Sequence, residues 1–88
     1  MIIEKFKPGK VLEMYERFAK QGRMLPEGVQ YVNSWINKDV TVCYQVMESE
    51  TDLLLNQWID KWKDLVDFEV IPVISSAEAK NKVFAGKQ

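Results

Sequence analysis

The stretch from Gly28 to Glu48, GVQYVNSWINKDVTVCYQVME, predicts a β-hairpin and decides the fold. Two runs rich in Val, Ile, Tyr and Trp, which favour strands, flank the turn-forming sequence Asn37-Lys38-Asp39. A hairpin with one face in water alternates apolar and polar residues, whereas this one carries large apolar side chains at both odd and even positions of its strands. A chain of 88 residues has little material with which to cover both faces of its sheet. The hairpin therefore implies a partner chain or a ligand.

The register of this hairpin decides which side chains share a face. With a three-residue turn at 37–39, Ile36 pairs with Val40 and one face is nearly all apolar, which suits packing under helices. That face consists of Val32, Ser34, Ile36, Val40, Val42, Tyr44 and Val46. The opposite face mixes rings, amides and a thiol, and consists of Val29, Tyr31, Asn33, Trp35, Thr41, Cys43, Gln45 and Met47. A two-residue turn would mix polar and apolar residues on both faces, which favours the three-residue turn.

Before the hairpin, the sequence predicts one strand and one helix. Residues 2–6 form the strand, which Pro8-Gly9 closes. From about Lys10 to Gln21, apolar residues recur every three or four positions, which is the spacing of a helix with one buried stripe. Gly22 suits the position after this helix, where the backbone must adopt a left-handed conformation.

After the hairpin, the sequence predicts a second helix and a fourth strand. Thr51 suits the N-cap of the helix. The apolar stripe of this helix includes Trp58 and Trp62, which we expect in the core. The strand covers residues 66–74 and alternates apolar with acidic side chains over its first half. Pro72 has no N–H to donate, so it lies at an edge or past the end of the ladder.

The order of these elements predicts the fold class. A capping box, Ser75-Ser76-Ala77-Glu78, begins a C-terminal helix that ends near Phe84. The order is therefore βαββαβ with one extra helix, in a single domain over residues 1–88. It predicts the α+β class, with a ferredoxin-like four-stranded antiparallel sheet. Right-handed crossovers place both main helices on one face of the sheet and leave the other face bare.

Composition excludes several classes of function. The net charge is −1 and the middle of the chain is acidic, which argues against a nucleic-acid partner. There is no histidine and only one cysteine, so we expect no metal site and no cofactor within one chain. No stretch approaches the roughly 20 apolar residues of a membrane span, and the N-terminus lacks the apolar region of a signal peptide. We therefore expect a cytoplasmic protein that does not bind membranes.

The mixed face of the hairpin is the predicted ligand-binding surface. Apolar walls with a few convergent polar groups are typical of a small-molecule pocket, whose volume is usually above about 300 Å³. The same composition fits a dimer interface with satisfied hydrogen bonds, so each of these residues also has a structural interpretation. The predicted ligand-binding residues are Tyr31, Asn33, Trp35, Cys43, Gln45 and Glu69.

Four of the ionisable residues have alternative roles. A buried Glu69 with a raised pKa is the candidate catalytic base, and a salt bridge to Lys5 or to an arginine of another chain is the structural alternative. Cys43 has no histidine to activate it as a nucleophile, and its alternative role is that of a small buried apolar residue. Arg17 and Arg23, near the end of the first helix, either bind an anionic substrate or lie solvated on the surface.

Three blocks of sequence carry a family resemblance: GRMLPEGVQYVNSW at 22–35, CYQVMES at 43–49 and LVDFEVIPVISSAEA at 65–79. They resemble a domain-of-unknown-function family of short, mainly bacterial proteins that is similar in layout to the dimeric α/β-barrel superfamily. The resemblance implies a homodimer paired through the open sheet faces. Together with the mixed face of the hairpin, this pairing predicts a small organic molecule bound in the barrel interior. Because that superfamily includes cofactor-free monooxygenases and isomerases, an enzyme of this kind is one alternative and a purely structural dimer is another.

Overall fold

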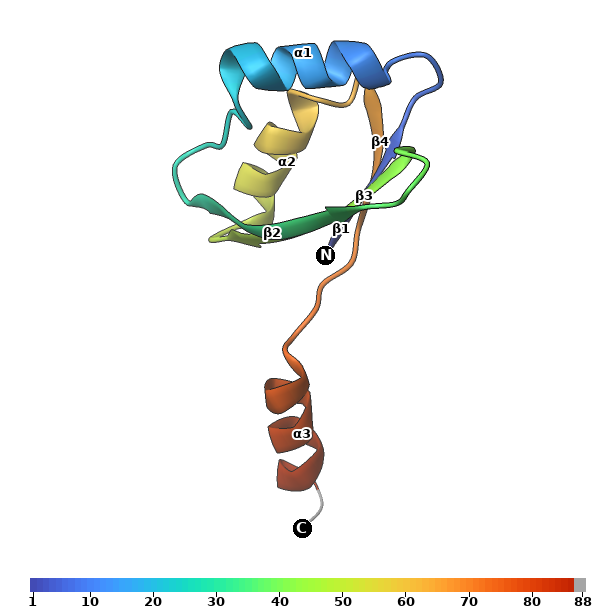
Figure 1. Ribbon diagram of the computed structural model, residues 1–88. Coiled ribbons are helices and arrows are strands. Elements are labelled where there is room, and N and C mark those ends of the chain that lie inside the picture. Colours follow the sequence, from blue (N-terminus) through green and yellow to red (C-terminus); the bar gives the residue numbers. More distant parts are fainter. Residues whose placement is uncertain (87–88) are drawn as a thin grey trace.

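The computed structural model describes residues 1–86, in which the elements follow the predicted order (Figure 1). The strands are β1 (Ile2–Phe6), β2 (Val29–Ile36), β3 (Val42–Ser49) and β4 (Val66–Val70), and the helices are α1 (Val11–Gln21), α2 (Asp52–Asp60) and α3 (Ser76–Ala85). The strands form one antiparallel sheet in the order β2-β3-β1-β4. Helices α1 and α2 lie over the same face of this sheet. This arrangement is the α+β, ferredoxin-like fold that the sequence predicts.

The ends of the helices form as their sequences predict. Gly22, after α1, has a φ of +64°, in the left-handed region that glycine adopts without strain. At the start of α2, the side-chain oxygen of Thr51 accepts a hydrogen bond from the backbone N–H of Leu54 at 3.2 Å. At the start of α3, the hydroxyl of Ser75 accepts one from the backbone N–H of Glu78 at 3.0 Å. Within the described residues, no helix is long and apolar enough to cross a membrane.

The turn of the hairpin is longer than predicted, and this reverses the faces of β3. Ile36 pairs with Cys43, three residues beyond its predicted partner. The side chain of Asn37 holds the wider turn, because its Oδ1 accepts hydrogen bonds from the backbone N–H groups of Thr41 and Val42 at 2.9 and 3.0 Å. A shift by an odd number of residues exchanges the two faces of a strand. Contrary to the prediction, the residues of β3 that face the helices are Cys43, Gln45 and Met47, and those on the open face are Val42, Tyr44 and Val46.

A β-bulge at Val32 divides β2 between the two faces. The pairing with β3 jumps from Tyr31 to Asn33, so Val32 between them has no partner. Tyr31 therefore faces the helices rather than the open side, which corrects the prediction for this residue. Asn33 and Trp35 lie on the open face, as predicted.

The core lies between α2 and the sheet. Trp58 and Trp62 are buried and form one cluster with Ile2 of β1, as predicted for both tryptophans. The ring of Trp58 meets the ring of Phe68 edge to face, with 5.5 Å between their centres. The indole N–H groups of both tryptophans donate to the backbone carbonyl of Arg23, at 2.9 and 3.1 Å. The core therefore fixes the backbone of the loop that follows α1.

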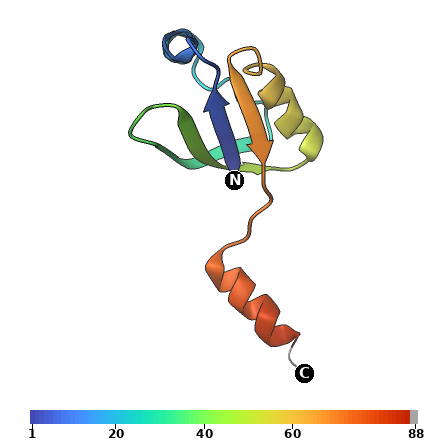
Figure 2. The same ribbon diagram turned by 90° about the vertical axis from the view of Figure 1, so that its right-hand side faces the viewer.

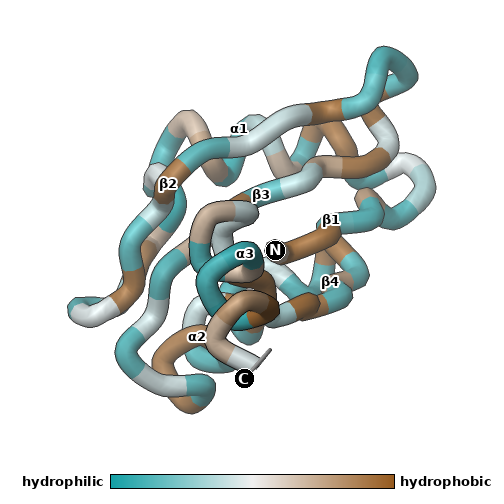
Figure 3. The backbone as a smooth tube through the Cα atoms, turned by 90° about the horizontal axis from the view of Figure 1, so that it is seen from below, coloured by the Kyte–Doolittle hydropathy of each residue, from teal (hydrophilic) through white to brown (hydrophobic). Residues whose placement is uncertain are grey.

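The last strand is shorter than predicted, and the chain leaves the body of the protein after it. Strand β4 ends at Val70, and hydrogen bonds of 2.7 and 2.8 Å then join the backbones of Met1 and Ile71. Pro72 lies past the ladder, as expected. Helix α3 stands clear of the sheet and of the other helices (Figures 1 and 2). Nearly all of residues 71–85 are exposed, and α3 carries both hydrophilic and hydrophobic segments in the view from below (Figure 3).

Candidate functional site

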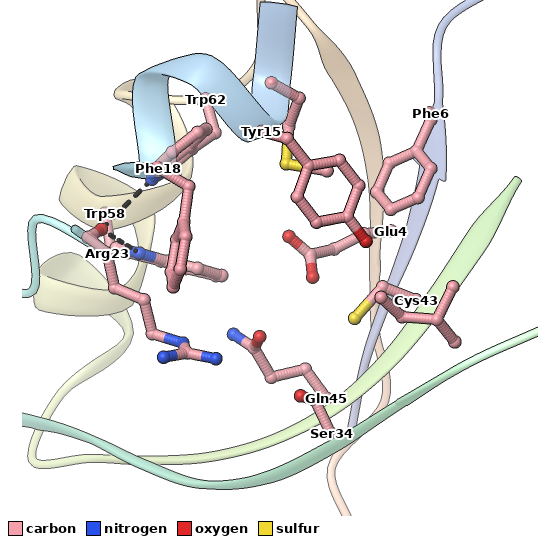
Figure 4. A pocket seen from close by; sticks show the side chains of 12 residues that line it. Glu4, Phe6, Tyr15, Phe18, Arg23, Ser34, Cys43, Gln45, Trp58 and Trp62 are labelled. Carbon is pink, nitrogen blue, oxygen red and sulfur yellow. Dashed lines mark hydrogen bonds between the residues drawn. The ribbon is translucent and has the colours of Figure 1, made fainter. Parts of the chain in front are cut away.

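A pocket of about 160 Å³ lies between the sheet and the two helices that cover it (Figure 4). Strands β1, β2 and β3 form its floor, and α1, α2 and the adjoining turns form its walls. Its polar groups come from Glu4, Arg23, Ser34, Cys43 and Gln45, and its apolar walls from Phe6, Met14, Tyr15, Phe18, Ile36, Trp58 and Trp62. A cavity of roughly 150 Å³ is known to accept benzene, so this pocket has room for about one ring. It is smaller than the volume of about 300 Å³ at which small-molecule sites usually begin.

The pocket lies under α1, which packs loosely on the sheet. This helix is amphipathic, yet none of its residues is buried. Tyr15 and Phe18, whose rings point into the pocket, remain more than a third exposed. The apolar stripe of α1 therefore faces a cavity instead of closely packed side chains, and a molecule in that cavity would complete the core.

Three neighbouring strands place the polar groups of the floor side by side. Glu4 of β1 pairs with Cys43 of β3, and Gln45 of β3 pairs with Ser34 of β2. Residues paired across antiparallel strands lie on the same face, so these four groups form one patch. A hydrogen bond of 2.7 Å joins the hydroxyls of Ser34 and Tyr31 at its border.

Glu4 is a carboxylate in an apolar environment. The residue is only 9% exposed, and burial raises its pKa above the ordinary value of 4.5. A hydrogen bond from the Cys43 thiol and the positive charge of Arg23 oppose this rise in pKa. Within residues 1–86, no lysine or arginine nitrogen lies within 4.0 Å of the carboxylate. A buried carboxylate without an ion pair lowers stability and often marks a functional site.

Arg23 supplies a positive charge to the pocket. Its guanidinium carbon lies 3.6 Å from the centre of the Tyr31 ring and 5.0 Å from the centre of the Phe18 ring, in cation–π contacts. Its side chain and the amide of Gln45 point toward one another across the pocket (Figure 4). Within the described chain, no carboxylate lies within 4.0 Å of the guanidinium. The N–H groups of Arg23 can therefore donate to a molecule in the pocket.

Cys43 and Gln45 complete the floor with groups of low reactivity. Burial, together with the negative charge of Glu4 and the hydrogen bond to it, raises the pKa of the Cys43 thiol to about 12. At neutral pH the thiol is protonated, so it acts as a weak hydrogen-bond donor and not as a nucleophile. The side chain of Gln45 is buried, and its Nε2 donates to the sulfur of Met47 at 3.0 Å.

Comparison with known proteins gives a family. The chain matches the domain of unknown function DUF3303 over residues 1–87. It belongs to this family. No curated protein and no solved structure matches it.

In this DUF3303 chain, three of the six predicted ligand-binding residues lie in or beside the pocket. Cys43 and Gln45 line it. Tyr31 borders it. The guanidinium of Arg23 lies over its ring, and its hydroxyl is hydrogen-bonded to the hydroxyl of Ser34. These three residues lie on the helix side of the sheet, whereas the prediction places all six residues on the open side.

The other three predicted residues, Asn33, Trp35 and Glu69, lie on the open face and away from the pocket. Glu69 is exposed and pairs with Ile3, whereas Asp67 is the residue opposite Lys5. The salt bridge between Glu69 and Lys5, one of the structural alternatives to a catalytic role, is not formed within the described residues. The nearest ion pair on this strand joins Asp67 to Lys7, at 4.0 Å.

Glu4 is not among the predicted site residues, although the sequence contains a signal for it. In the strand of residues 2–6, IIEKF, the alternation places Glu4 on the same face as the apolar Ile2 and Phe6. An acidic residue at a core-facing position of a strand is unusual. Of the two arginines that the sequence singles out, Arg23 reaches the pocket, whereas Arg17 lies outside it.

Proposed function

We propose that this protein binds a small organic molecule, about one ring in size, in the pocket between its helices and its sheet. The observation that carries this proposal is Glu4, a buried carboxylate that no cation of the described chain neutralises at close range. Aromatic walls around a few convergent polar groups are typical of ligand sites. Catalytic or binding groups are also a common reason for a protein to retain a destabilising buried charge.

The two charges of the pocket define the chemistry of the proposed ligand. Arg23 and the amide of Gln45 would donate hydrogen bonds to an anionic or carbonyl oxygen. Glu4 would accept a hydrogen bond from a hydroxyl group of the same molecule. The rings of Phe18 and Trp58 would contact its flat faces. Hydroxybenzoates, which carry a carboxylate and a phenolic hydroxyl on one ring, have this combination of groups.

The proposal includes a homodimer that pairs through the open sheet faces. The open face exposes Trp35, at 55% of its surface, together with Tyr44 and the unpaired Val32 of the bulge. Contiguous exposed apolar surface of this kind commonly marks an interaction site. A dimer of standard size would bury about 1,200–2,000 Å² in total. A stable monomer at micromolar concentration, measured by light scattering, would remove the dimer from the proposal.

A second candidate function is a cofactor-independent enzyme in which Glu4 replaces Glu69 as the base. Its buried carboxylate and raised pKa suit it to accept a proton from a bound carbonyl compound and return it to another carbon. Arg23 and Gln45 would stabilise the negative oxygen that forms. Exchange of ligand hydrogen for solvent deuterium, followed by NMR, tests this function. Exchange that is equally fast with the Glu4→Gln variant would rule out this role of Glu4.

Isothermal titration calorimetry with benzoate, phenol and toluene tests binding. We expect benzoate to bind, and we expect Arg23→Met to weaken it at least tenfold, because a hydrogen bond to a charged group contributes about 1.5–3 kcal/mol. The substitution changes only the side chain, so the backbone carbonyl of residue 23 can still accept hydrogen bonds from the two tryptophans. Lys20→Met, at an exposed position of α1 outside the pocket, is the control and should leave the affinity unchanged. If no probe binds at millimolar concentration, or if the Arg23 and Lys20 variants behave alike, the proposal is wrong.

A further inference from the structure

The described chain ends in an arm, residues 71–86, whose apolar side chains are exposed. Val83 and Phe84 of α3 expose 71% and 58% of their surface. The segment before α3 adds three more exposed apolar residues, Ile71, Val73 and Ile74. Five large apolar side chains on sixteen consecutive residues are more than a solvated tail requires, and they indicate a surface that packs against another one.

Helix α3 is too short to be stable in water without packing. It has ten residues, and isolated helices shorter than about 12–15 residues are marginal even with good helix-forming sequences. The N-cap of Ser75 contributes only about 1 kcal/mol. The formation of α3 therefore requires contacts from its apolar side chains.

The arm does not turn back toward its own body. Residues 71–75 contain Pro72, which favours an extended backbone at Ile71, and they form no turn. The arm continues past the end of β4, away from the sheet (Figures 1 and 2). The radius of gyration is 15.4 Å, whereas a compact chain of this length has one of about 12 Å.

The middle of the chain offers the complementary surface. Residues 24–69 contain nine acidic and three basic side chains, whereas the arm carries Lys80 and Lys82 against the single acid Glu78. On the open face of the sheet, the same stretch exposes three large apolar residues, Val32, Trp35 and Tyr44. An apolar, basic arm thus matches an apolar, acidic body of the same sequence.

We infer that the arm of each chain packs across residues 24–69 of a second copy, so that two copies exchange arms. This inference rests on the proposed homodimer and adds to it the segment that joins the two chains. Together with the open sheet face, the arm supplies the roughly 20 to 30 residues that each partner contributes to a standard interface. In a two-fold dimer every such contact is made twice.

The double substitution Val83→Ser and Phe84→Ser in the full chain tests the exchange. Serine has a helix propensity similar to those of valine and phenylalanine, so the substitution removes apolar contacts more than it disfavours the helix. We expect the dissociation constant of the dimer, measured by analytical ultracentrifugation, to rise at least about a hundredfold. Asn81→Ser, at an exposed polar position of the same helix, is the matched control and should leave that constant unchanged.

A mixed dimer of isotope-labelled and unlabelled full-length chains gives a direct measurement. We expect NMR contacts between the Phe84 ring of one chain and methyl groups in residues 24–69 of the other. If the native chain is a dimer but the double substitution leaves its dissociation constant unchanged, or if all contacts of Phe84 lie within one chain, arm exchange is wrong and the dimer stands. If the native chain is a monomer, both the dimer and the exchange are wrong.

Discussion

Glu4→Gln should make the protein more stable at neutral pH, although it removes a charged group that could attract Arg23. Glutamine has nearly the same shape as glutamate but no charge to desolvate. Glu4 is 9% exposed and has no cation within 4.0 Å in the described chain. Leaving a buried polar group without a full set of partners costs roughly 1–3 kcal/mol. We therefore expect the substitution to stabilise the fold by a similar amount, or about 4–8 °C in Tm for each kcal/mol.

The sign of the pH dependence follows from the raised pKa of Glu4. Below the ordinary value of 4.5, Glu4 is protonated in both the folded and the unfolded chain, so its burial as an ion costs nothing. As the pH rises above 4.5, the unfolded chain loses the proton first and the free energy of unfolding falls. This fall is complete once the pH exceeds the raised pKa of the folded state. The advantage of Glu4→Gln should therefore grow with pH and then level off.

Urea unfolding between pH 4 and 8, followed by tryptophan fluorescence, measures this effect. The two buried tryptophans make the signal sensitive to loss of the core. Subtracting the unfolding free energy of the native sequence from that of Glu4→Gln removes the contributions of distant groups. If the two curves run parallel, or if Glu4→Gln is the less stable protein at pH 7, the description of Glu4 as an unneutralised buried carboxylate is wrong.

Three further predictions concern other parts of the chain. Asp64→Asn should remove at most about 1 kcal/mol, because Arg17 binds Asp64 in an exposed pair at 2.7 and 2.8 Å. The arginine lowers the pKa of Asp64 from 3.8 to about 2. This contribution to stability should therefore be fully present above pH 3.8 and lost as the pH falls through 2, which acid unfolding measures. Gly28→Ala should cost about 1–3 kcal/mol in urea, because φ is +92° and the new methyl group would lie 2.9 Å from Leu54 Cδ1. With a pKa of about 12, Cys43 should resist a disulfide reagent at pH 8 and react at the normal rate in urea.

The fold follows from signals that lie close together in the sequence. Thr51 and Ser75 cap helices because their side chains are three residues from the N–H groups that they satisfy. The alternation of residues 66–70 orients β4 correctly, since nothing interrupts this strand. These local signals determine the order of the elements, and the order determines the topology of the sheet.

The faces of the hairpin depend on two details that the alternation of residues does not contain. Asn37 widens the turn through its side chain, and Val32 drops out of the pairing. Each of these two features exchanges the faces of part of a strand. Cys43 and Gln45 therefore lie under the helices, while Asn33 stays on the open face. The predicted site residues therefore lie on two different faces of the sheet, because the prediction assumes a shorter turn and hence a different pairing of β2 with β3. Only the three-dimensional arrangement brings Glu4 and Arg23 to the same pocket.

The three tryptophans provide the most direct measurement of the central claim, which is that the ligand site lies under the helices. Trp58 and Trp62 line the pocket, whereas Trp35 lies on the open face. Their indole N–H signals in a nitrogen–proton NMR spectrum report separately on the two faces of the sheet. On titration with benzoate, we expect the signals of Trp58 and Trp62 to shift and that of Trp35 to stay in place. A shift confined to Trp35, or no shift of any indole signal at millimolar benzoate, would contradict the claim.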